Sequence, residues 1–330
     1  MGLNILLTGG AGYIGSSVAH YLIDKGHEIT VVDSLITGNR KLVPEKANFK
    51  LCDISDQKEI SAIINNSKFD IVMHFAGLIR VDESIKEPEK YNEYNFTKAK
   101  VFFDTCFKNN LKKVVFSSTA SIYGNPKNNV VNENDELKPI NPYALSKYNL
   151  ERYLIEQSKK SNIKFIILRY FNVAGAEDKM RTGLVSKHST HLIKVACEVA
   201  TKKRKKLIIN GNDYDTVDGT PVRDFIHISD LSEMHLLSAL DLVKNEKSNI
   251  FNCGYGEGFS VLQVINVLNK NLGYDISTSF GNRRDGDIAS IVANSKKFSN
   301  YFSWSPKYQN LSLILKSSLE WENKIKKLDN

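Results

Sequence analysis

Hydrophobic positions in the first half of the chain fall in short continuous runs, and segments with a mixed polar and apolar pattern separate them. Continuous apolar runs of this length are typical of parallel strands that are buried on both faces of a sheet. The intervening segments are long enough for helices, so strands and helices should alternate. The pattern therefore predicts an α/β fold built on a doubly wound parallel sheet. The predicted strands are 3–8, 27–33, 48–54, 69–76, 112–118 and 164–170.

This regular alternation loosens after about residue 176. Loop-like composition follows over 177–192 and 211–225, before helical patterns return. We therefore predict two domains, one over residues 1–176 and a smaller C-terminal α/β lobe over 177–330 that binds the substrate. Segments near 225–255 include another buried-strand pattern and are expected to rejoin the first domain.

The composition is ordinary for a globular protein of 330 residues, with 42% hydrophobic and 25% charged residues. No run approaches the roughly 18 apolar residues that a membrane span needs. The first ten residues contain a short apolar core that runs directly into glycines, which is the pattern of a strand and not of a signal peptide. We expect a cytoplasmic protein with no membrane partner.

Neither the cysteines nor the charges indicate a further partner. Cys52, Cys106, Cys197 and Cys253 are scattered singly, without the spacing of a zinc site or a disulfide scaffold, so we expect reduced thiols and no metal. The net charge of +8 includes a basic run at 202–206 that lacks the interleaved aromatic residues of a nucleic-acid surface. We expect this run to be a solvated loop, in a protein with no nucleic-acid partner.

The segment TGGAGYIG at 8–15 has the spacing of a dinucleotide-binding turn. Gly9, Gly12 and Gly15 would allow a tight turn, a close approach to a pyrophosphate and a close helix contact. The turn follows the first predicted strand and opens a helix, whose N-terminal amides can bind an anion. Asp33 ends the second predicted strand, where a carboxylate can bind ribose hydroxyls and repel a 2′-phosphate. The sequence thus predicts a Rossmann domain that binds NAD, although Asp33 could alternatively do no more than cap a turn.

The segment NPYALSKY at 141–148 places Tyr143 and Lys147 four residues apart, directly after Pro142. Proline suits the first turn of a helix, so the two side chains should lie on one helical face. An ammonium one turn away favours the phenolate and would lower the tyrosine pKa from its usual value of about 10. The pair is a candidate general base. The alternative is a packed tyrosine beside a solvated lysine.

Together with SSTASIYG at 117–124, these motifs resemble the extended short-chain dehydrogenase/reductase family, and within it the nucleotide-sugar 4-epimerases. The similarity extends nearly from end to end. It includes HFAG at 74, NPYALSK at 141, LRYFNVAGA at 168, GNDYDTVDGTPVRDFIHISDL at 211 and RRDGD at 283.

The resemblance implies roles for particular residues. Tyr143 would remove the proton of the sugar 4-hydroxyl, Lys147 would bind the nicotinamide ribose and lower the phenol pKa, and Thr119 would pass on or stabilise the proton. The positions that it assigns to NAD are Gly9, Gly12, Tyr13, Ile14, Gly15, Asp33, Ser34, Thr37, Gly38, Asp53, Ile54, Phe75, Ala76, Gly77, Ile79, Asn95, Ser117, Thr119, Tyr143, Lys147 and Phe171.

The resemblance also implies a site for a UDP-sugar. Arg223 and Arg284 suit a diphosphate, because each guanidinium can donate a forked pair of hydrogen bonds. At Ile291 the family varies between tyrosine and smaller residues, and this position is thought to limit the hexose 2-substituent. Val173 and Asn210 depart from the proline and the aromatic residue that many relatives have. The positions assigned to the substrate are Thr119, Tyr143, Asn172, His191, Leu192, Ile208, Asn210, Arg223, Arg284, Asp287 and Ile291.

The expected activity is NAD-dependent epimerisation at C4 of a UDP-hexose, which would interconvert UDP-glucose and UDP-galactose through a transient 4-keto sugar. Epimerases of UDP-GlcNAc or UDP-glucuronate stay open as alternatives, and so does a non-catalytic module that senses NAD. A 4,6-dehydratase is disfavoured because Ala120 and Ser121, not an acidic residue, follow Thr119. Helical segments at 91–107 and 143–157 resemble the pair that forms a homodimer interface in this family. The aromatic residues expected to supply its apolar surface are Tyr91, Tyr94, Phe96, Phe102, Phe103 and Phe107, although some of them must instead cover the chain's own sheet.

Overall fold

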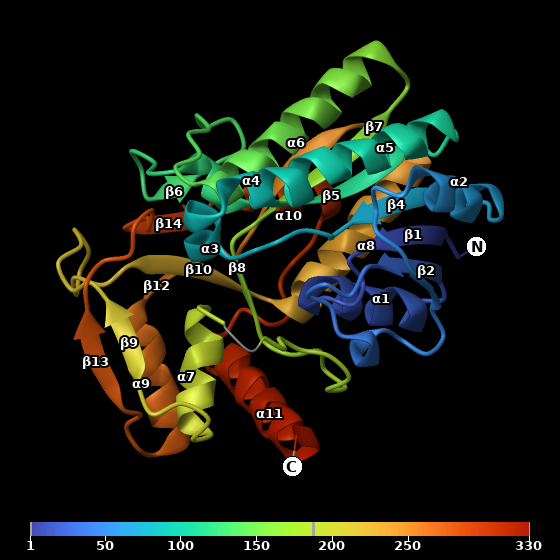
Figure 1. Cartoon of the computed structure of the whole chain (residues 1–330). Coiled ribbons are helices and arrows are strands. Elements are labelled where there is room, and N and C mark those ends of the chain that lie inside the picture. Colours follow the sequence, from blue (N-terminus) through green and yellow to red (C-terminus); the bar gives the residue numbers. More distant parts are fainter. Residues whose placement is uncertain (1, 187–188, 330) are drawn as a thin grey trace. The chain divides into compact units, whose positions relative to one another are not determined.

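A computed structural model describes residues 2–186 and 189–329 (Figure 1). Contacts divide the chain into two units that interleave along the sequence. Unit 1 comprises 1–122, 139–170 and 232–251, and unit 2 comprises 123–138, 171–231 and 252–330. The division at residue 176 into an NAD-binding domain and a substrate lobe assigns functions to parts of the chain, and it stays a prediction.

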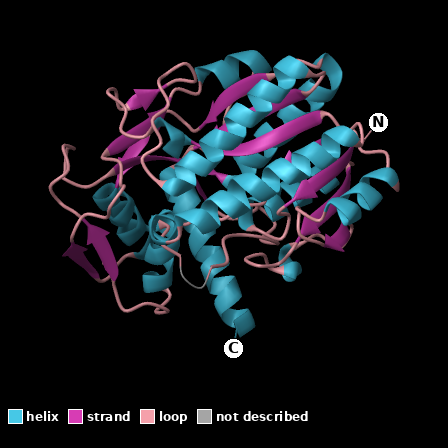
Figure 2. Ribbon diagram, turned by 45° about the horizontal axis from the view of Figure 1, so that its top comes forward, coloured by secondary structure: helices cyan, strands magenta, loops and turns pink. Residues whose placement is uncertain are grey.

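The predicted apolar runs of unit 1 form a seven-stranded sheet in the order β11-β7-β5-β4-β1-β2-β3. The first six strands along the chain that enter this sheet pair in parallel. Figure 2 shows these strands with helices alongside. The predicted doubly wound parallel fold is therefore confirmed. The strands are β1 (Asn4–Thr8), β2 (Glu28–Asp33), β3 (Asn48–Leu51), β4 (Ile71–His74), β5 (Lys113–Thr119), β7 (Lys164–Tyr170) and β11 (Asn249–Cys253).

The strand order reverses at β1, which lies between β2 and β4. In open α/β sheets the crevice at such a switch point, outside the carboxyl ends of the strands, is the usual ligand site. Here the glycine turn follows β1 and the segment 75–77 follows β4. The topology therefore brings two predicted cofactor segments to one edge of the sheet.

The helices of unit 1 follow the strands as predicted. Figure 1 shows α5 and α6 running side by side, and the Tyr153 hydroxyl of α6 donates to Asp104 of α5 at 2.5 Å. A short π-helical segment joins α4 to α5. The helices are α1 (Tyr13–Asp24), α2 (Gln57–Asn65), α3 (Val81–Lys86), α4 (Pro88–Asn92), the π-helix η2 (Glu93–Thr97), α5 (Lys98–Lys108), α6 (Pro142–Lys160) and α8 (Ile228–Asn245), with 3-10 turns η1 (Arg40–Leu42) and η3 (Ala120–Tyr123).

The core of unit 1 takes most of the aromatic residues that were expected on a dimer surface. Tyr91, Phe102 and Phe103 are fully buried within the chain. Phe96 and Phe107 are half-buried and pack against the same core. Those side chains cover the chain's own sheet, because an amphipathic helix on a sheet turns its apolar face inward.

Unit 2 contains two smaller sheets. In the first, β10 pairs with β8 and β14 in parallel and with β12 antiparallel, and β6 continues beyond β14. In the second, β9 pairs with β13 in parallel. Helices α7, α9 and α11 pack around a second apolar core. The elements are β6 (Val130–Val131), β8 (Asn172–Ala174), α7 (Leu192–Ala200), β9 (Leu207–Asn210), β10 (Val222–His227), β12 (Gly258–Ser260), α9 (Val261–Leu272), β13 (Thr278–Gly281), β14 (Ser290–Ala293), α10 (Lys296–Phe302) and α11 (Leu311–Asp329).

Three further observations concern the described residues as a whole. None of their helices has both the length and the apolar character needed to cross a membrane. No group of three or more His, Cys, Asp or Glu side chains among them could hold a metal ion. The four cysteines are buried and free, and burial raises the pKa of the Cys52 thiol to about 11.

Candidate active site

The glycine turn after β1 leaves no room for side chains. Gly9 has φ +73°, and a β-carbon there would lie 2.5 Å from the Ala76 amide nitrogen. A β-carbon on Gly15 would lie 2.3 Å from the Gly9 carbonyl oxygen. The Gly12 amide donates to the Gly9 carbonyl at 3.1 Å, and α1 begins at the next residue. The first amides of α1 have no partner within the helix, so this turn can receive a phosphate.

Asp33 stabilises the same turn from the end of β2. One carboxylate oxygen accepts from the Ala11 amide at 2.9 Å, and the other accepts from the Leu35 amide at 2.8 Å. The alternative role as a turn cap is therefore part of what Asp33 does. Each oxygen has a further lone pair, and the carboxylate lines the cleft described next. Both roles fit together in one side chain.

A cleft with about 650 Å³ of empty space, part of it open to solvent, lies along this edge of the sheet. The predicted cofactor residues that line it are Gly9, Gly12, Asp33, Ser34, Thr37, Gly38, Asp53, Ile54, Phe75, Ala76 and Gly77. Sequence reasoning missed the lining residues Val32, Ile36, Cys52, Leu78, Tyr94 and Lys98.

Tyr94 and Lys98 were missed because their neighbours in space come from distant segments. The Lys98 ammonium contacts Asp53 at 2.6 Å and lies 4.3 Å from the centre of the Tyr94 ring. Burial alone would raise the pKa of Asp53, but hydrogen bonds from Lys98 and Ser55 outweigh it and hold the pKa below its usual value. A clue was present in the sequence, since Tyr94 and Lys98 have the same spacing as Tyr143 and Lys147.

Other predicted cofactor residues lie outside the cleft lining. Tyr13, Ile14 and Gly15 form the first turn of α1. Ile79 is 67% exposed, and Phe171 belongs to unit 2, where its amide donates to the Cys253 carbonyl.

Asn95 has an internal role in the structure. Its side-chain oxygen accepts from the Leu78 amide at 2.7 Å, and its nitrogen donates to the Leu78 carbonyl at 2.9 Å and to Ser146 at 3.2 Å. Asn95 is 1% exposed and lies in the π-helical segment, a deformation that is frequent at functional sites. It fixes the loop that follows β4. A direct contact between Asn95 and the cofactor stays a prediction.

The three predicted catalytic residues lie together in unit 1. The helix α6 begins at Pro142 as predicted, and the Asn141 side chain caps it by accepting from the Ala144 amide at 2.8 Å. This start places Tyr143 within a hydrogen bond of Thr119, the last residue of β5.

Lys147 is 4% exposed and donates to the Ser117 carbonyl at 3.1 Å. It also adjoins the cleft, because a β-carbon on the cleft residue Gly77 would lie 3.5 Å from the Lys147 ammonium nitrogen. The alternative of a solvated lysine is therefore wrong.

The electrostatics of Tyr143 differ from the expectation. Burial raises the pKa of the Tyr143 phenol, and the hydrogen bond with Thr119 opposes this rise without cancelling it. Burial lowers the pKa of Lys147 to about 8, against the attraction of Glu151. The predicted lowering of the phenol pKa by Lys147 is not observed in the chain by itself, because loss of solvent dominates both groups.

Four predicted substrate residues gather in unit 2. Arg223 of β10 and Ile291 of β14 are register partners on adjacent strands. Arg223 lies 3.8 Å from the Asp287 carboxylate, and the Asp287 amide donates to the Arg284 carbonyl at 3.3 Å. The Arg284 side chain is exposed and has no ion pair among the described residues. An exposed guanidinium that has no ion pair among the described residues suits an anionic ligand.

The neighbouring Arg283 is engaged elsewhere. It binds Asp213 at 2.7 Å, and its guanidinium lies 4.2 Å from the centre of the Tyr214 ring. The structure therefore distinguishes the two adjacent arginines of RRDGD.

The remaining predicted substrate residues are spread over unit 2. Ile208 and Asn210 lie on β9, where Ile208 is 52% exposed, and Asn172 begins β8.

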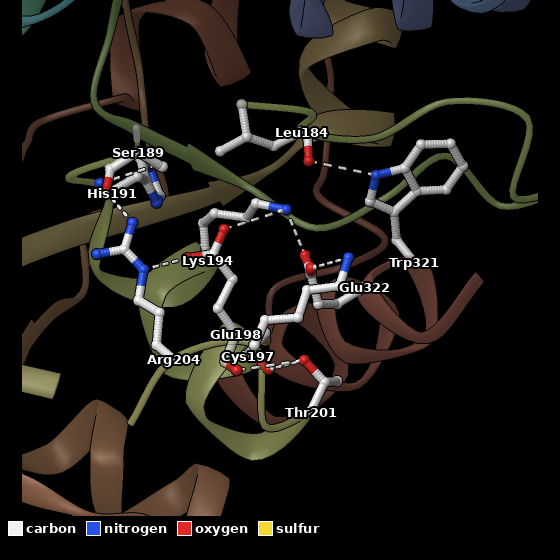
Figure 3. Close-up of polar contacts among 11 residues, drawn as sticks. Leu184, Ser189, His191, Lys194, Cys197, Glu198, Thr201, Arg204, Trp321 and Glu322 are labelled. Atoms are coloured by element: carbon white, nitrogen blue, oxygen red, sulfur yellow. Dashed lines mark hydrogen bonds and ion pairs between the residues drawn. The ribbon is translucent and has the colours of Figure 1, made fainter. Parts of the chain in front are cut away.

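His191 is the N-cap residue of α7, and Leu192 is the first residue of this helix. Figure 3 shows His191 beside Ser189, whose hydroxyl accepts from the His191 amide. Burial lowers the pKa of His191 to about 4, against a hydrogen bond with the Val173 backbone, so its imidazole is neutral at pH 7.

Buried ion pairs hold the start of α7. Lys194 binds Glu322 of α11, and Arg204 binds both Glu198 and the Ser189 carbonyl, the latter at 3.1 Å (Figure 3). Lys203 also contacts Glu322, at 3.1 Å. The interpretation of 202–206 as a solvated loop is confirmed, since these residues lie outside helices and strands and all except the half-buried Arg204 are exposed.

Comparisons with known proteins identify the family of this chain. The model of the NAD dependent epimerase/dehydratase family matches residues 5–254, and the chain belongs to this family. Curated relatives include UDP-glucose 4-epimerases from Azospirillum brasilense and Lactobacillus helveticus. Each is 40% identical over 97% of this chain, which corresponds to 92% and 97% of the relatives.

Solved structures extend the likeness to three dimensions. UDP-glucose 4-epimerase from Bifidobacterium longum, in complex with NAD⁺ and UDP, has a TM-score of 0.93 and 32% identity, covering 97% of this chain and 98% of that one. The UDP-Glc/GlcNAc 4-epimerase from Campylobacter jejuni has a TM-score of 0.84 and 42% identity, covering 98% and 100%. The resemblance inferred from the motifs and the predicted cofactor, NAD, are confirmed.

The unit 1 cleft fits NAD on its own geometry. The glycine turn offers backbone amides where a β-carbon on Gly9 or Gly15 would not fit, the Asp33 carboxylate lines the cleft, and Gly77 leaves the cleft wall open beside Lys147. Gly9, Gly12 and Asp33 would thus hold the dinucleotide, with Thr119, Tyr143 and Lys147 at its reactive end.

Proposed function

We propose that this protein interconverts UDP-glucose and UDP-galactose by NAD-dependent epimerisation at C4, through a transient 4-keto sugar. The observation that carries the proposal is the hydrogen bond between Thr119 and Tyr143 beside the buried Lys147, at the wall of a cleft that fits NAD. Relatives named UDP-glucose 4-epimerase support the reaction type.

When bound, NAD would supply the redox chemistry of this mechanism, which is removal of a hydride from C4 and its return to the opposite face of the sugar. Tyr143 takes the proton of the 4-hydroxyl and later gives it back, and Thr119 steadies the phenol oxygen during both transfers. When the Lys147 amine is protonated, it places a positive charge close to this oxygen. Tyr143 can accept this proton only as the phenolate, which burial disfavours and which the hydrogen bond with Thr119 and the charge of Lys147 favour.

The remaining residues bind and orient. Arg223 and Arg284 are assigned to the diphosphate, since their guanidinium groups match phosphate oxygens and Arg284 has no competing ion pair among the described residues. The hexose must be free to turn while the nucleotide stays bound. Contacts with the UDP part must therefore supply most of the binding energy of the substrate.

The proposal is tested by incubating purified protein with NAD and UDP-galactose and measuring UDP-glucose by chromatography. Accumulation of UDP-glucose up to a constant ratio from either sugar is expected. Tyr143→Phe should abolish this turnover and retain bound NAD. If the native protein binds NAD without forming any epimer, the non-catalytic NAD-sensing alternative is favoured.

A second candidate substrate is UDP-GlcNAc. Ile291, which is 4% exposed and pairs in register with Arg223, is smaller than tyrosine. The Campylobacter jejuni neighbour is named a UDP-Glc/GlcNAc 4-epimerase. Turnover of UDP-GlcNAc, and its reduction in Ile291→Tyr, would extend the activity to N-acetylated sugars, and UDP-glucuronate in the same assay tests the uronic-acid alternative.

We also propose a cytoplasmic homodimer. Leu145 of α6 is 47% exposed and Ile140, just before this helix, is 41% exposed, which leaves apolar surface at this end of α6. Sedimentation at micromolar concentration measures the state, and a monomer mass would contradict the dimer.

A further inference from the structure

A third residue shares the helical face of Tyr143 and Lys147. Glu151 follows Lys147 by four positions on α6, so the three side chains lie one turn apart in succession. Glu151 is 1% exposed. Carboxylates are almost never buried to this degree unless they are paired. Nothing in the motifs singled this glutamate out.

Glu151 is clamped by two residues of the sheet. Arg169 of β7 donates from Nη2 to Oε2 at 2.7 Å and from Nε to both carboxylate oxygens, at 3.2 and 3.3 Å. Ser118 of β5 donates its hydroxyl to Oε1. Ser118 and Arg169 are register partners on adjacent strands, and Arg169 is 2% exposed. The clamp is therefore a buried ionic cluster that fastens α6 to two strands.

On both α6 and β5, the clamp lies next to the residues that contact Tyr143 and Lys147. Thr119 bonds Tyr143, Ser118 bonds Glu151, and the Ser117 carbonyl accepts from Lys147. Three successive residues at the end of β5 thus contact three positions spaced by four on α6. A shift of α6 along β5 would break all three contacts together.

We propose that Glu151, clamped by Arg169 and Ser118, is a positioning residue that holds α6 in register with β5 and keeps the Lys147 ammonium charged beside Tyr143. The catalytic consequence of this proposal rests on the proposed function. The effect on Lys147 does not, because it concerns the protein by itself.

The groups around Lys147 make Glu151 the source of negative charge. From β4, His74 is neutral at pH 7, because burial and the charge of Lys147 lower its pKa to about 3. From β5 come the Ser117 carbonyl and the Phe116 ring, whose centre is 5.2 Å from the ammonium. A β-carbon on Gly77 would touch both Lys147 and the amide oxygen of Asn95, another neutral group. Tyr143 completes the set from the same helix.

The electrostatics support this arrangement. Burial lowers the pKa of Lys147 to about 8, and the charge of Glu151 is the influence that opposes the decrease. Without that charge, a larger fraction of Lys147 would be neutral at working pH.

The direct test is a lysine titration that needs neither substrate nor turnover. Protein labelled with ¹³C at lysine Cε is titrated by NMR, and Lys147→Arg assigns the Lys147 signal. The native midpoint is expected near 8. The double variant Glu151→Gln/Arg169→Met removes both charges and leaves none unpaired, and its midpoint is expected at least about half a pH unit lower. Glu151→Asp keeps the charge and should lie between the two.

The same variants are assayed with NAD and UDP-galactose across pH. The alkaline limb of kcat should move toward lower pH by the same amount as the lysine midpoint, with KM little changed. Glu151→Asp should move the alkaline limb of kcat less far than the double variant does. Glu322→Gln is the matched control, since Glu322 is 1% exposed and pairs with Lys194. It should lower thermal stability and leave the alkaline limb in place.

Two outcomes would overturn the proposal. One is a Lys147 midpoint unchanged in the double variant. The other is an alkaline limb that Glu322→Gln moves as far as the double variant does, which would indicate a general effect of weakened packing. If the double variant does not fold, Glu151→Asp decides alone, because it keeps Arg169 paired, and a native midpoint in that variant counts against Glu151. Absence of epimerisation in the native protein would refute the proposed function and leave the titration to decide this inference.

Discussion

Two Tyr-x-x-x-Lys pairs adjoin the same cleft, and they behave differently. In the first, the Lys98 ammonium lies 4.3 Å from the centre of the Tyr94 ring and binds Asp53 at 2.6 Å. Both side chains line the cleft and keep some exposure. In the second, Lys147 is buried and Tyr143 bonds a hydroxyl of the sheet. Equal spacing on a helix therefore gives a lysine paired with a carboxylate in one place and a buried lysine hydrogen-bonded to a backbone carbonyl in the other.

The difference comes from the strand that faces each helix. Opposite Lys98 is a carboxylate, which neutralises the ammonium and leaves the tyrosine hydroxyl without a role in the pair. Opposite Lys147 is the Ser117 carbonyl, which orients the ammonium without neutralising it, while Thr119 holds the phenol. The spacing brings the two side chains together, and the surroundings decide their chemistry.

The largest expected effect distinguishes the two tyrosines. Tyr143→Phe should lower kcat on the order of 10³-fold, because it removes the proton acceptor and leaves the ring. Tyr94→Phe is the matched control and should keep native kcat. The measurement is the initial rate of UDP-galactose conversion at saturating NAD. Equal losses in the two variants would remove the distinction drawn between the pairs.

The second largest expected effect concerns Thr119, the hydrogen-bond partner of the Tyr143 phenol. Thr119→Val keeps the shape of the side chain and removes the hydroxyl, so the Tyr143 pKa should rise further and kcat should decrease roughly 10- to 100-fold. Thr119→Ser should retain most of the rate, because it keeps the hydroxyl. The pH dependence of kcat is the readout, and a native profile for the valine variant would argue against a role for Thr119.

A third prediction concerns stability. The folded pKa of Lys147 is about 8, below the ordinary lysine value of 10.5, so between these two pH values the unfolded chain binds more protons than the native one. The free energy of unfolding should therefore increase with pH in this window, with a contribution from Lys147 of up to about 1.4 kcal/mol per pH unit. Lys147→Met should lack this contribution. Urea unfolding of both proteins at pH 7 to 10.5 gives the difference, and parallel curves would indicate that Lys147 is not desolvated.

The smallest effect belongs to the other lysine. Lys98→Met should weaken NAD binding about fivefold, since it removes a partly exposed ion pair at the cleft wall, and should leave kcat at saturating NAD unchanged. Calorimetric titration of NAD measures the affinity. A lower kcat in this variant would place Lys98 closer to the reacting atoms than we propose.

Much of the site followed from short sequence patterns. The glycine turn, Asp33 and the start of α6 at Pro142 depend on backbone geometry within a few residues, which local sequence specifies. The contacts of Lys203 and Arg204 with carboxylates were not predicted, because those partners lie on helices that the local pattern does not reveal.

By itself, the sequence determined the alternation of strands and helices, the dinucleotide turn and the pairing of Tyr143 with Lys147, because each depends on neighbours in the chain. Only the tertiary structure decided that Asn95 braces the loop after β4, that Glu151 lies between Arg169 and Ser118, and that burial raises the Tyr143 pKa. Those properties depend on contacts between residues far apart in sequence and on the exclusion of water, which exist only once the sheet and its helices have packed together.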